Sequence, residues 1–358
     1  MDEKWLGIYE KLVNIDTGYE IEVEKKLEST SFLVDILKDM GFEVRRGEAS
    51  HIAVKGRPPY ITMIGHLDTV FRAGEPERRP FEIDGNVVRG PGVADMKGGV
   101  VIMLMVLEEI SRSYKNVGVG VVLNVDEELG SPLGSKDHVD MAENSRFCLS
   151  FETGGGNWKV VTKRKGIASL KIRVFGKSGH ASNPDSGANA VVELSGKVPL
   201  LVSTNFGELT LVPTIIEGGS KSNVIPDSAW LYCDVRFSSF EELDHLKKMV
   251  DDILKDRSVR GTSSSYELEI RRLPMDEIEE SLKILEGASK RLGEEIETVH
   301  TGGGGDASYY TSKGVPAIDG LGIVGRGIHS EDEEAFLDSV EPRFRLAMAL
   351  FEEIVGRG

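Results

Sequence analysis

The chain has little cysteine, no long apolar run and a shortage of basic residues. Cys148 and Cys233 are its only cysteines in 358 residues, too few for a disulfide framework or a thiolate zinc cluster. No stretch of about 18 apolar residues occurs, so we expect no membrane span. The first residues, 1–5, lack a basic segment followed by an apolar one, which argues against a secretory signal and favours a cytoplasmic location.

The charge balance excludes one class of partner. The chain has 43 Lys and Arg against 59 Asp and Glu, a net charge of −16. Such a surface repels phosphate backbones, so we expect no nucleic-acid binding. With 40% hydrophobic and 28% charged residues, the composition is typical of a soluble globular protein.

The first part of the chain alternates helical and strand patterns. This alternation predicts an α/β domain with a mixed, largely parallel sheet flanked by helices. The patterns predict helices within the first 45 residues and at 100–110, and strands at 52–54, 60–64 and 117–125.

From about residue 164 the pattern changes. Strand patterns at 168–175, 209–216, 229–237 and 266–272 alternate with helical patterns at 188–201 and 240–254 in the order β-α-β-β-α-β. That order is typical of a ferredoxin-like α+β unit with an antiparallel sheet. We therefore predict that residues 164–272 form a domain inserted into a larger one made of residues 1–163 and 273–358.

Several acids and histidines follow predicted strands or sit in glycine-rich loops. His66 and Asp68 end one strand and share a side of it, and Glu127 and Glu128 follow the central strand. Glu152 follows the apolar segment 147–151. Taken singly, each is more often a surface pair or a solvated turn.

Two further residues lie in glycine-rich loops. Asp95 stands between such a loop and an apolar helix, where an N-cap would explain it equally well, and His329 lies in a second glycine-rich loop. Two histidines with several carboxylates and no thiolate suit a pair of divalent ions, which would need a bridging carboxylate and a general base.

Five motifs follow one another along the chain. They are Gly65-His66-Leu67-Asp68-Thr69-Val70, Gly90-Pro91-Gly92-Val93-Ala94-Asp95-Met96-Lys97-Gly98-Gly99, Asp126-Glu127-Glu128-Leu129-Gly130, Asn223-Val224-Ile225-Pro226 and the loop of His329. In this order they resemble one family, the dinuclear zinc hydrolases that include acetylornithine deacetylase, succinyl-diaminopimelate desuccinylase, aminoacylase and the glutamate carboxypeptidases of the carboxypeptidase G type. The likeness is greatest to the last branch and covers nearly the whole chain. It implies a zinc-exopeptidase-like fold whose inserted domain serves as lid and dimerisation domain.

The resemblance implies a role for each metal-site residue. Asp95 would bridge two ions, zinc first with cobalt or manganese as alternatives, and the Asp95–Met96 peptide would be cis. Glu127 would be the general base that activates a metal-bridging water, and Asp68 would orient His66. The ligand sets would be His66 and Glu152 for one ion, and Glu128 and His329 for the other.

The resemblance also implies substrate contacts. His180 would reach the partner subunit's active site in a homodimer, and Asn223 and Arg236 would contact the substrate carboxylate. One departure stands out: His300 occupies the position before Thr301-Gly302-Gly303-Gly304 where the glutamate carboxypeptidase branch has Arg. Imidazole is a weaker, pH-dependent partner for an anion, which puts a glutamate leaving group in question.

The expected activity is metal-dependent hydrolysis of an amide, releasing an amino acid from a peptide or N-acyl-amino acid in the manner of a carboxypeptidase. An N-acyl-amino-acid deacylase is the alternative within the same chemistry, and an aminopeptidase is a weaker one. A non-catalytic dimeric metal-binding protein would have no use for the base Glu127. A nucleotide-binding role for the glycine run 302–305 lacks the Lys-Ser/Thr of a phosphate loop.

Overall fold

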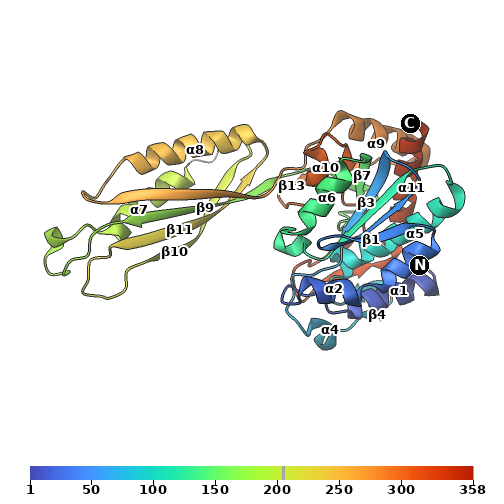
Figure 1. Cartoon of the computed structure of the whole chain (residues 1–358), viewed down its shortest axis with the longest axis horizontal. Coiled ribbons are helices and arrows are strands. Elements are labelled where there is room, and N and C mark those ends of the chain that lie inside the picture. Colours follow the sequence, from blue (N-terminus) through green and yellow to red (C-terminus); the bar gives the residue numbers. More distant parts are fainter. Residues whose placement is uncertain (204–205, 358) are drawn as a thin grey trace. The chain divides into compact units, whose positions relative to one another are not determined.

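The computed structural model describes residues 1–203 and 206–357 (Figure 1). No helix in these ranges is both long and apolar enough to cross a membrane. Contacts between residues divide the chain into two compact units, which are described separately below. The first comprises Met1–Lys163, Met275–Thr301 and Gly305–Gly358, and the second comprises Arg164–Pro274 with Gly302–Gly304.

A mixed sheet forms the centre of the first unit. Within the described residues it has six strands in the order β1-β2-β6-β3-β7-β14. β3 runs parallel to β6 and β7, and β14 runs parallel to β7, whereas β1 and β2 form an antiparallel edge. The strand bounds are β1 (Glu43–Arg46), β2 (Ser50–Lys55), β3 (Tyr60–His66), β6 (Val119–Asn124), β7 (Ser145–Ser150) and β14 (Ala317–Ile318).

Helices cover both faces of this sheet because its strands are apolar on both sides. In β6, Val121 and Leu123 join one hydrophobic core, while Val122 joins the core on the opposite face. The first core includes α1 (Glu3–Asn14), α5 (Gly98–Ser113), α9 (Glu279–Leu292) and α11 (Val340–Arg357), with residues of α2 (Val23–Ser29) and α3 (Phe32–Asp39). The second core includes α6 (Gly134–Ala142) and α10 (Ala307–Thr311). The α/β class predicted from the sequence is confirmed.

Two small sheets were not predicted, because their strands of two to six residues show no clear alternation. One has the order β15-β16-β5-β4, and the other pairs β8 with β13. The first is important for the site because the segment between β15 and β16 carries His329. The bounds are β4 (Glu82–Asp84), β5 (Val87–Arg89), β8 (Lys159–Arg164), β13 (Glu297–Thr301), β15 (Gly325–Arg326) and β16 (Glu334–Phe336).

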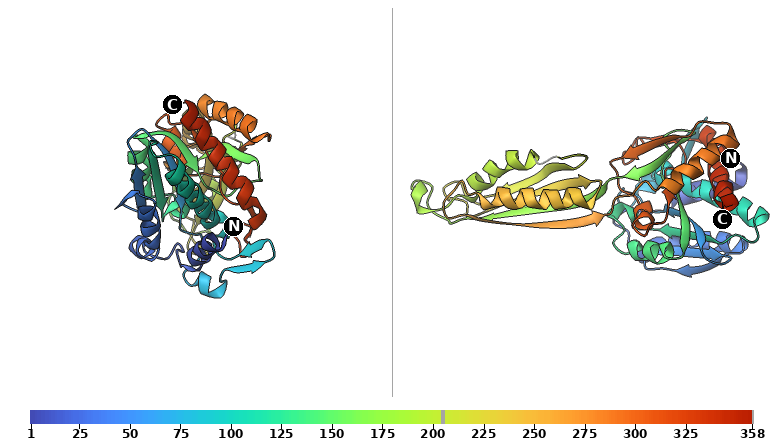
Figure 2. Two further views of the ribbon diagram at one scale, coloured as in Figure 1. Left: turned by 90° about the vertical axis from the view of Figure 1, so that its right-hand side faces the viewer. Right: turned by 90° about the horizontal axis from the view of Figure 1, so that it is seen from above.

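The second unit has the predicted β-α-β-β-α-β order and an antiparallel sheet in the order β10-β11-β9-β12. Helices α7 and α8 lie on one face of it (Figures 1 and 2). Strand β11 alternates between buried and more exposed residues, as a strand with one covered face requires. The bounds are β9 (Gly166–Phe175), α7 (Ala190–Val202), β10 (Thr210–Gly218), β11 (Ser228–Phe237), α8 (Phe240–Lys255) and β12 (Ser263–Arg272).

Candidate metal centre

Three neighbouring strands end beside one another, and each is followed by a predicted ligand. His66 is the last residue of β3, Glu128 follows β6, and Glu152 follows β7. Because β3 pairs in parallel with both β6 and β7, their carboxyl ends meet at one edge of the sheet. His66 Nε2 lies 3.8 Å from Glu152 Oε2.

Asp95 reaches the same edge from the loop that precedes α5. Gly92 begins the loop in the left-handed region, with φ 77°, and the Asp95–Met96 peptide is cis, as predicted. A Cβ on Gly99 would collide with the carbonyl oxygen of Phe151, so glycine lets the start of α5 pack against the end of β7. The loop and the strand end are thereby brought close together.

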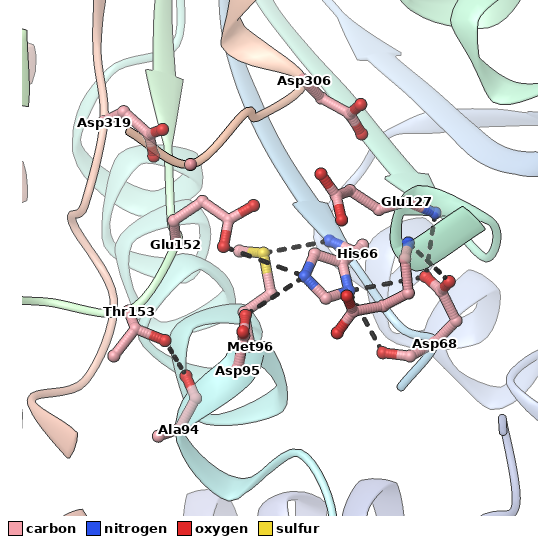
Figure 3. A network of polar contacts seen from close by, with 12 residues as sticks. His66, Asp68, Ala94, Asp95, Met96, Glu127, Glu152, Thr153, Asp306 and Asp319 are labelled. Carbon is pink, nitrogen blue, oxygen red and sulfur yellow. Dashed lines mark hydrogen bonds and ion pairs between the residues drawn. The ribbon is translucent and has the colours of Figure 1, made fainter. Parts of the chain in front are cut away.

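The Asp95 carboxylate lies between the two predicted histidine ligands. Its Oδ1 is 3.4 Å from His66 Nε2, and its Oδ2 is 3.0 Å from His329 Nε2. His329 Nε2 is also 3.4 Å from Glu128 Oε2. His66, Asp95 and Glu128 each offer one possible ligand atom, and these three atoms lie within 4.8 Å of one another. The structure therefore brings all five predicted ligands together, and Figure 3 shows His66, Asp95 and Glu152 among them.

The five side chains differ in exposure. His329 is 52% exposed and has a positive φ of 63°, whereas the other four side chains are at most 13% exposed. Non-glycine residues seldom adopt a positive φ, so the surrounding loop must hold His329 in place. The site thus has a buried side on the sheet and an open side at His329.

Asp68 has two functions in this arrangement (Figure 3). His66 Nδ1 lies 3.1 Å from the Asp68 carbonyl oxygen and 3.4 Å from its Oδ1, which leaves Nε2 directed at Asp95 and Glu152. The same carboxylate accepts the backbone N–H groups of Glu127 at 3.2 Å and Glu128 at 3.0 Å. One buried acid therefore fixes the imidazole and the turn that carries the predicted base. The sequence predicted only the first of these contacts.

The electrostatics reflect acids and imidazoles crowded at a buried edge. Burial alone would lower the pKa of His66, but carboxylates led by Glu152 raise it well above its usual value. Hydrogen bonds to Asp95 and Glu128 raise the pKa of His329 to about 10. Burial raises the pKa of Glu128 and of Glu152 to about 7. Burial also opposes ionisation of Asp95, but His329 and His66 hold the pKa of Asp95 below its usual range.

These pKa shifts predict that metal binding releases protons. Without metal, the raised pKa values of His66 and His329 favour protonated imidazoles, and the raised pKa values of Glu128 and Glu152 favour protonated carboxyls. Ligands bind as neutral imidazole and as carboxylate, so metal binding should displace protons from these groups. Affinity should therefore rise with pH through neutrality. Titration calorimetry in buffers of different ionisation enthalpy measures this, and binding without proton release would contradict it.

The donor chemistry fits divalent metal ions. Two imidazoles and three carboxylates without thiolate are ligands that zinc, cobalt and manganese accept. The buried carboxylates repel one another, and a cation between them removes that repulsion. In this set Asp95 alone faces both histidines, so it has the geometry expected of a shared ligand.

The predicted substrate residues belong to other segments of the chain. In the second unit, His180 is exposed and pairs with Val224 beside Asn223, whose carbonyl oxygen accepts the N–H of Ala181. Arg236, on β11, forms a two-bond ion pair with Asp234 and donates to the carbonyl of Gly302.

His300 lies on β13 in the first unit, where its Nε2 is 3.3 Å from Glu277 Oε2. Arg236 and His300 therefore both face a carboxylate of the chain itself. Asp234 and Arg236 are two residues apart on one strand, so period two could have predicted their pairing. No comparable spacing in the sequence predicted that Glu277 would pair with His300.

Sequence reasoning missed one residue that contacts the site. Glu333 is 1% exposed and accepts three backbone N–H groups from the loop of Asp95. The available signal was the position of Glu333 four residues after the predicted ligand His329. The sequence alone does not show that Glu333 is buried.

Comparison with known proteins agrees with this geometry. A model of the peptidase family M20/M25/M40 matches residues 62–353. Carboxypeptidase G2 of Pseudomonas sp. (strain RS-16) is 33% identical over 360 residues, which cover 95% of this chain and 86% of that protein. Succinyl-diaminopimelate desuccinylase of Legionella pneumophila (strain Lens) is 24% identical over 359 residues, covering 90% of this chain and 93% of that one.

A solved structure shares the fold. A tripeptidase from Staphylococcus aureus subsp. aureus Mu50 superposes with a TM-score of 0.82 at 20% identity, covering 99% of each chain. All five residues of the cluster lie inside the matched range 62–353. The resemblance predicted from the motifs is confirmed: the chain is a hydrolytic enzyme that belongs to the metal-dependent peptidase family M20/M25/M40.

Proposed function

We propose that the chain is a dinuclear metallo-exopeptidase that hydrolyses an amide and releases an amino acid from a small peptide or an N-acyl-amino acid. Asp95 would serve both ions, most readily zinc, and His66 and Glu152 would hold one while Glu128 and His329 would hold the other. The supporting observation is the Asp95 carboxylate, whose two oxygens face different histidines at 3.4 and 3.0 Å. A single-ion site has no need of such a shared carboxylate.

In this proposal Glu127 moves the proton. It takes a proton from the attacking water, whose oxygen adds to the amide carbonyl carbon, and gives that proton to the leaving nitrogen as the C–N bond breaks. Asp68 holds the Glu127 backbone through its N–H, so the base keeps a fixed position beside Glu128. Bound divalent ions polarise the carbonyl and make the water more acidic.

Carboxypeptidase activity is the first choice, because the relative that is 33% identical over most of the chain is named a carboxypeptidase. One observation favours a deacylase or a neutral leaving group instead. Arg236 and His300, the residues expected near a substrate carboxylate, already pair with Asp234 and Glu277. Less positive charge is then available for a leaving glutamate, which carries two carboxylates.

A hydrolysis panel tests the proposed function. Purified protein loaded with zinc or cobalt is given N-acetyl-amino acids, dipeptides and folyl- or benzoyl-glutamate, and released amino acid is measured. We expect cleavage of at least one class, with neutral C-terminal residues preferred over glutamate. If loaded protein cleaves no amide, the enzymatic proposal fails and a metal-binding protein without catalysis replaces it.

We further propose that the second unit is a lid and dimerisation domain in a homodimer. Its edge strand β10 exposes Val212, Ile215 and Ile216, each about half exposed, and the adjacent helix α7 exposes Val192 and Leu200. An edge strand that exposes apolar side chains favours pairing with another strand. In the proposed homodimer, β10 of one copy pairs with β10 of the other across a two-fold axis.

The oligomeric state tests the dimer. Ile216→Lys should shift the protein from dimer to monomer in sedimentation or light scattering, because it places a charge in the apolar contact. Ile270→Lys is the matched control, since Ile270 is 41% exposed on β12 at the opposite edge of the same sheet. A wild-type monomer, or a dimer lost only with the control, would contradict the interface.

A mixing experiment tests the proposed action of His180 across the dimer. His180→Ala and Glu127→Ala should each be nearly inactive. Random mixed dimers should recover about a quarter of wild-type activity, because half of the dimers are mixed and each has one intact site. Recovery requires His180 from one subunit and Glu127 from the other. If the mixture stays inactive while mixed dimers form, His180 acts within its own subunit.

A further inference from the structure

We infer that Glu333 is a positioning residue that sets the half of the metal centre formed by Asp95 and His329. Its carboxylate accepts the backbone N–H groups of Gly92 at 3.0 Å, Ala94 at 2.8 Å and Asp95 at 2.9 Å. Three converging N–H groups form a cradle for an anion, and here the anion is supplied by the chain itself. This inference rests on the proposed function.

The segment of Glu333 also carries His329. Strands β15 and β16 form the base of a hairpin, with Gly325 opposite Ala335 and Arg326 opposite Glu334, and His329 lies in the loop between them. A Cβ on Gly325 would collide with the side chain of Ala94, so the hairpin packs directly against the Asp95 loop. Glu333, just before β16, therefore joins the two segments that present Asp95 and His329.

The expected effect is unequal for the two ions. The ion assigned to Glu128, His329 and the shared Asp95 has two of three ligands on segments that Glu333 joins. The ion assigned to His66, Glu152 and Asp95 has one, because His66 and Glu152 follow strands of the central sheet. Loss of the Glu333 carboxylate should thus weaken the first ion far more than the second.

The Asp95 loop has a second anchor, which helps a variant at Glu333 to fold. Tyr9, on α1, donates its hydroxyl hydrogen bond to the carbonyl of Val93, within the same loop. Thr153 Oγ1 also donates to the carbonyl of Ala94 in this loop, so removing the Glu333 charge leaves the loop attached through Val93 and Ala94 while freeing the backbone N–H of Asp95.

Glu333→Gln is the variant of choice, since an amide keeps the shape but turns one N–H-accepting oxygen into a donor. Glu334→Gln is the matched control: it is the next residue, loses the same charge, and instead pairs with Arg89 and Arg326. Zinc binding is measured by titration calorimetry and metal analysis. We expect two equivalents in wild type and in the control. In Glu333→Gln one equivalent should stay tight and the other should weaken roughly 10–100-fold.

Combination with ligand variants identifies the ion affected. Adding Glu333→Gln to His329→Ala should change the remaining affinity little, whereas adding it to His66→Ala should remove most remaining binding. If Glu333→Gln does not fold, Glu333→Asp, which keeps the charge on a shorter side chain, should show the same unequal weakening to a smaller degree.

Three outcomes overturn the inference. Two tight ions in Glu333→Gln would show that the cradle has no effect on the centre. Equal weakening of both ions would indicate a general structural role. A folded wild-type chain that binds fewer than two ions would contradict the proposed function, and the inference would fall with it, whereas the first two outcomes leave the proposed function standing.

Discussion

Glu127→Gln should lose roughly 10²–10⁴-fold in kcat while keeping its bound metal. The amide cannot accept the proton of the attacking water, yet the five predicted ligands remain unchanged. The Glu127 backbone N–H still donates to Asp68, so the turn should keep its place. Single-turnover kinetics and metal analysis on the same sample measure both quantities.

The neighbouring acid provides the control for this prediction. Glu128 lies on the same turn, and its Oε2 is 3.4 Å from His329 Nε2, so Glu128→Gln should lose metal as well as activity. If Glu127→Gln loses metal to the same extent, Glu127 is a ligand and the base lies elsewhere. If its kcat is unchanged, it has no part in proton transfer.

Asp95→Asn should abolish activity and remove tight binding of both ions. Its two carboxylate oxygens face His66 and His329, so this one substitution alters the contacts of both histidines. An amide offers one neutral oxygen in place of two oxygens that share a negative charge. The buried site then lacks an anion that both ions can share. We expect a loss larger than that of Glu127→Gln, because positioning and activation of the water both depend on the ions.

A buried acid that is not a predicted ligand is the matched control. The carboxylate of Asp126 accepts the backbone N–H groups of Leu133 and Gly134, and Asp126→Asn should keep both ions. Metal content by emission spectrometry separates the two variants. Retention of both ions in Asp95→Asn would show that the shared carboxylate is not required.

The sequence predicted the parts of the fold that have strong periodicity. The second unit alternates buried and exposed residues along β11, and its six elements appear in the predicted order. The cluster of predicted ligands could be expected as a set because His66 ends a strand and Glu128 and Glu152 each follow one, although each had an ordinary explanation when taken singly. The prediction of a metal site rested on the order of all five residues along the chain, Asp95 and His329 included.

What the sequence did not reveal depends on contacts between distant segments. The hairpin that carries His329 has strands of two and three residues, too short to show a pattern. Glu333 and Glu277 look like ordinary surface acids until the fold places one beside the Asp95 loop and the other beside His300. Because the pairing of a side chain depends on tertiary register, it follows from the fold and not from composition.

The metal requirement of amide hydrolysis tests the central claim most directly. Metal content and hydrolysis rate are followed on one sample through chelation and stepwise re-addition of zinc. The account predicts two equivalents per chain in active protein, no activity when they are removed, and recovery that is complete only when both return. Full activity in metal-free protein, or full recovery with a single equivalent, would contradict it.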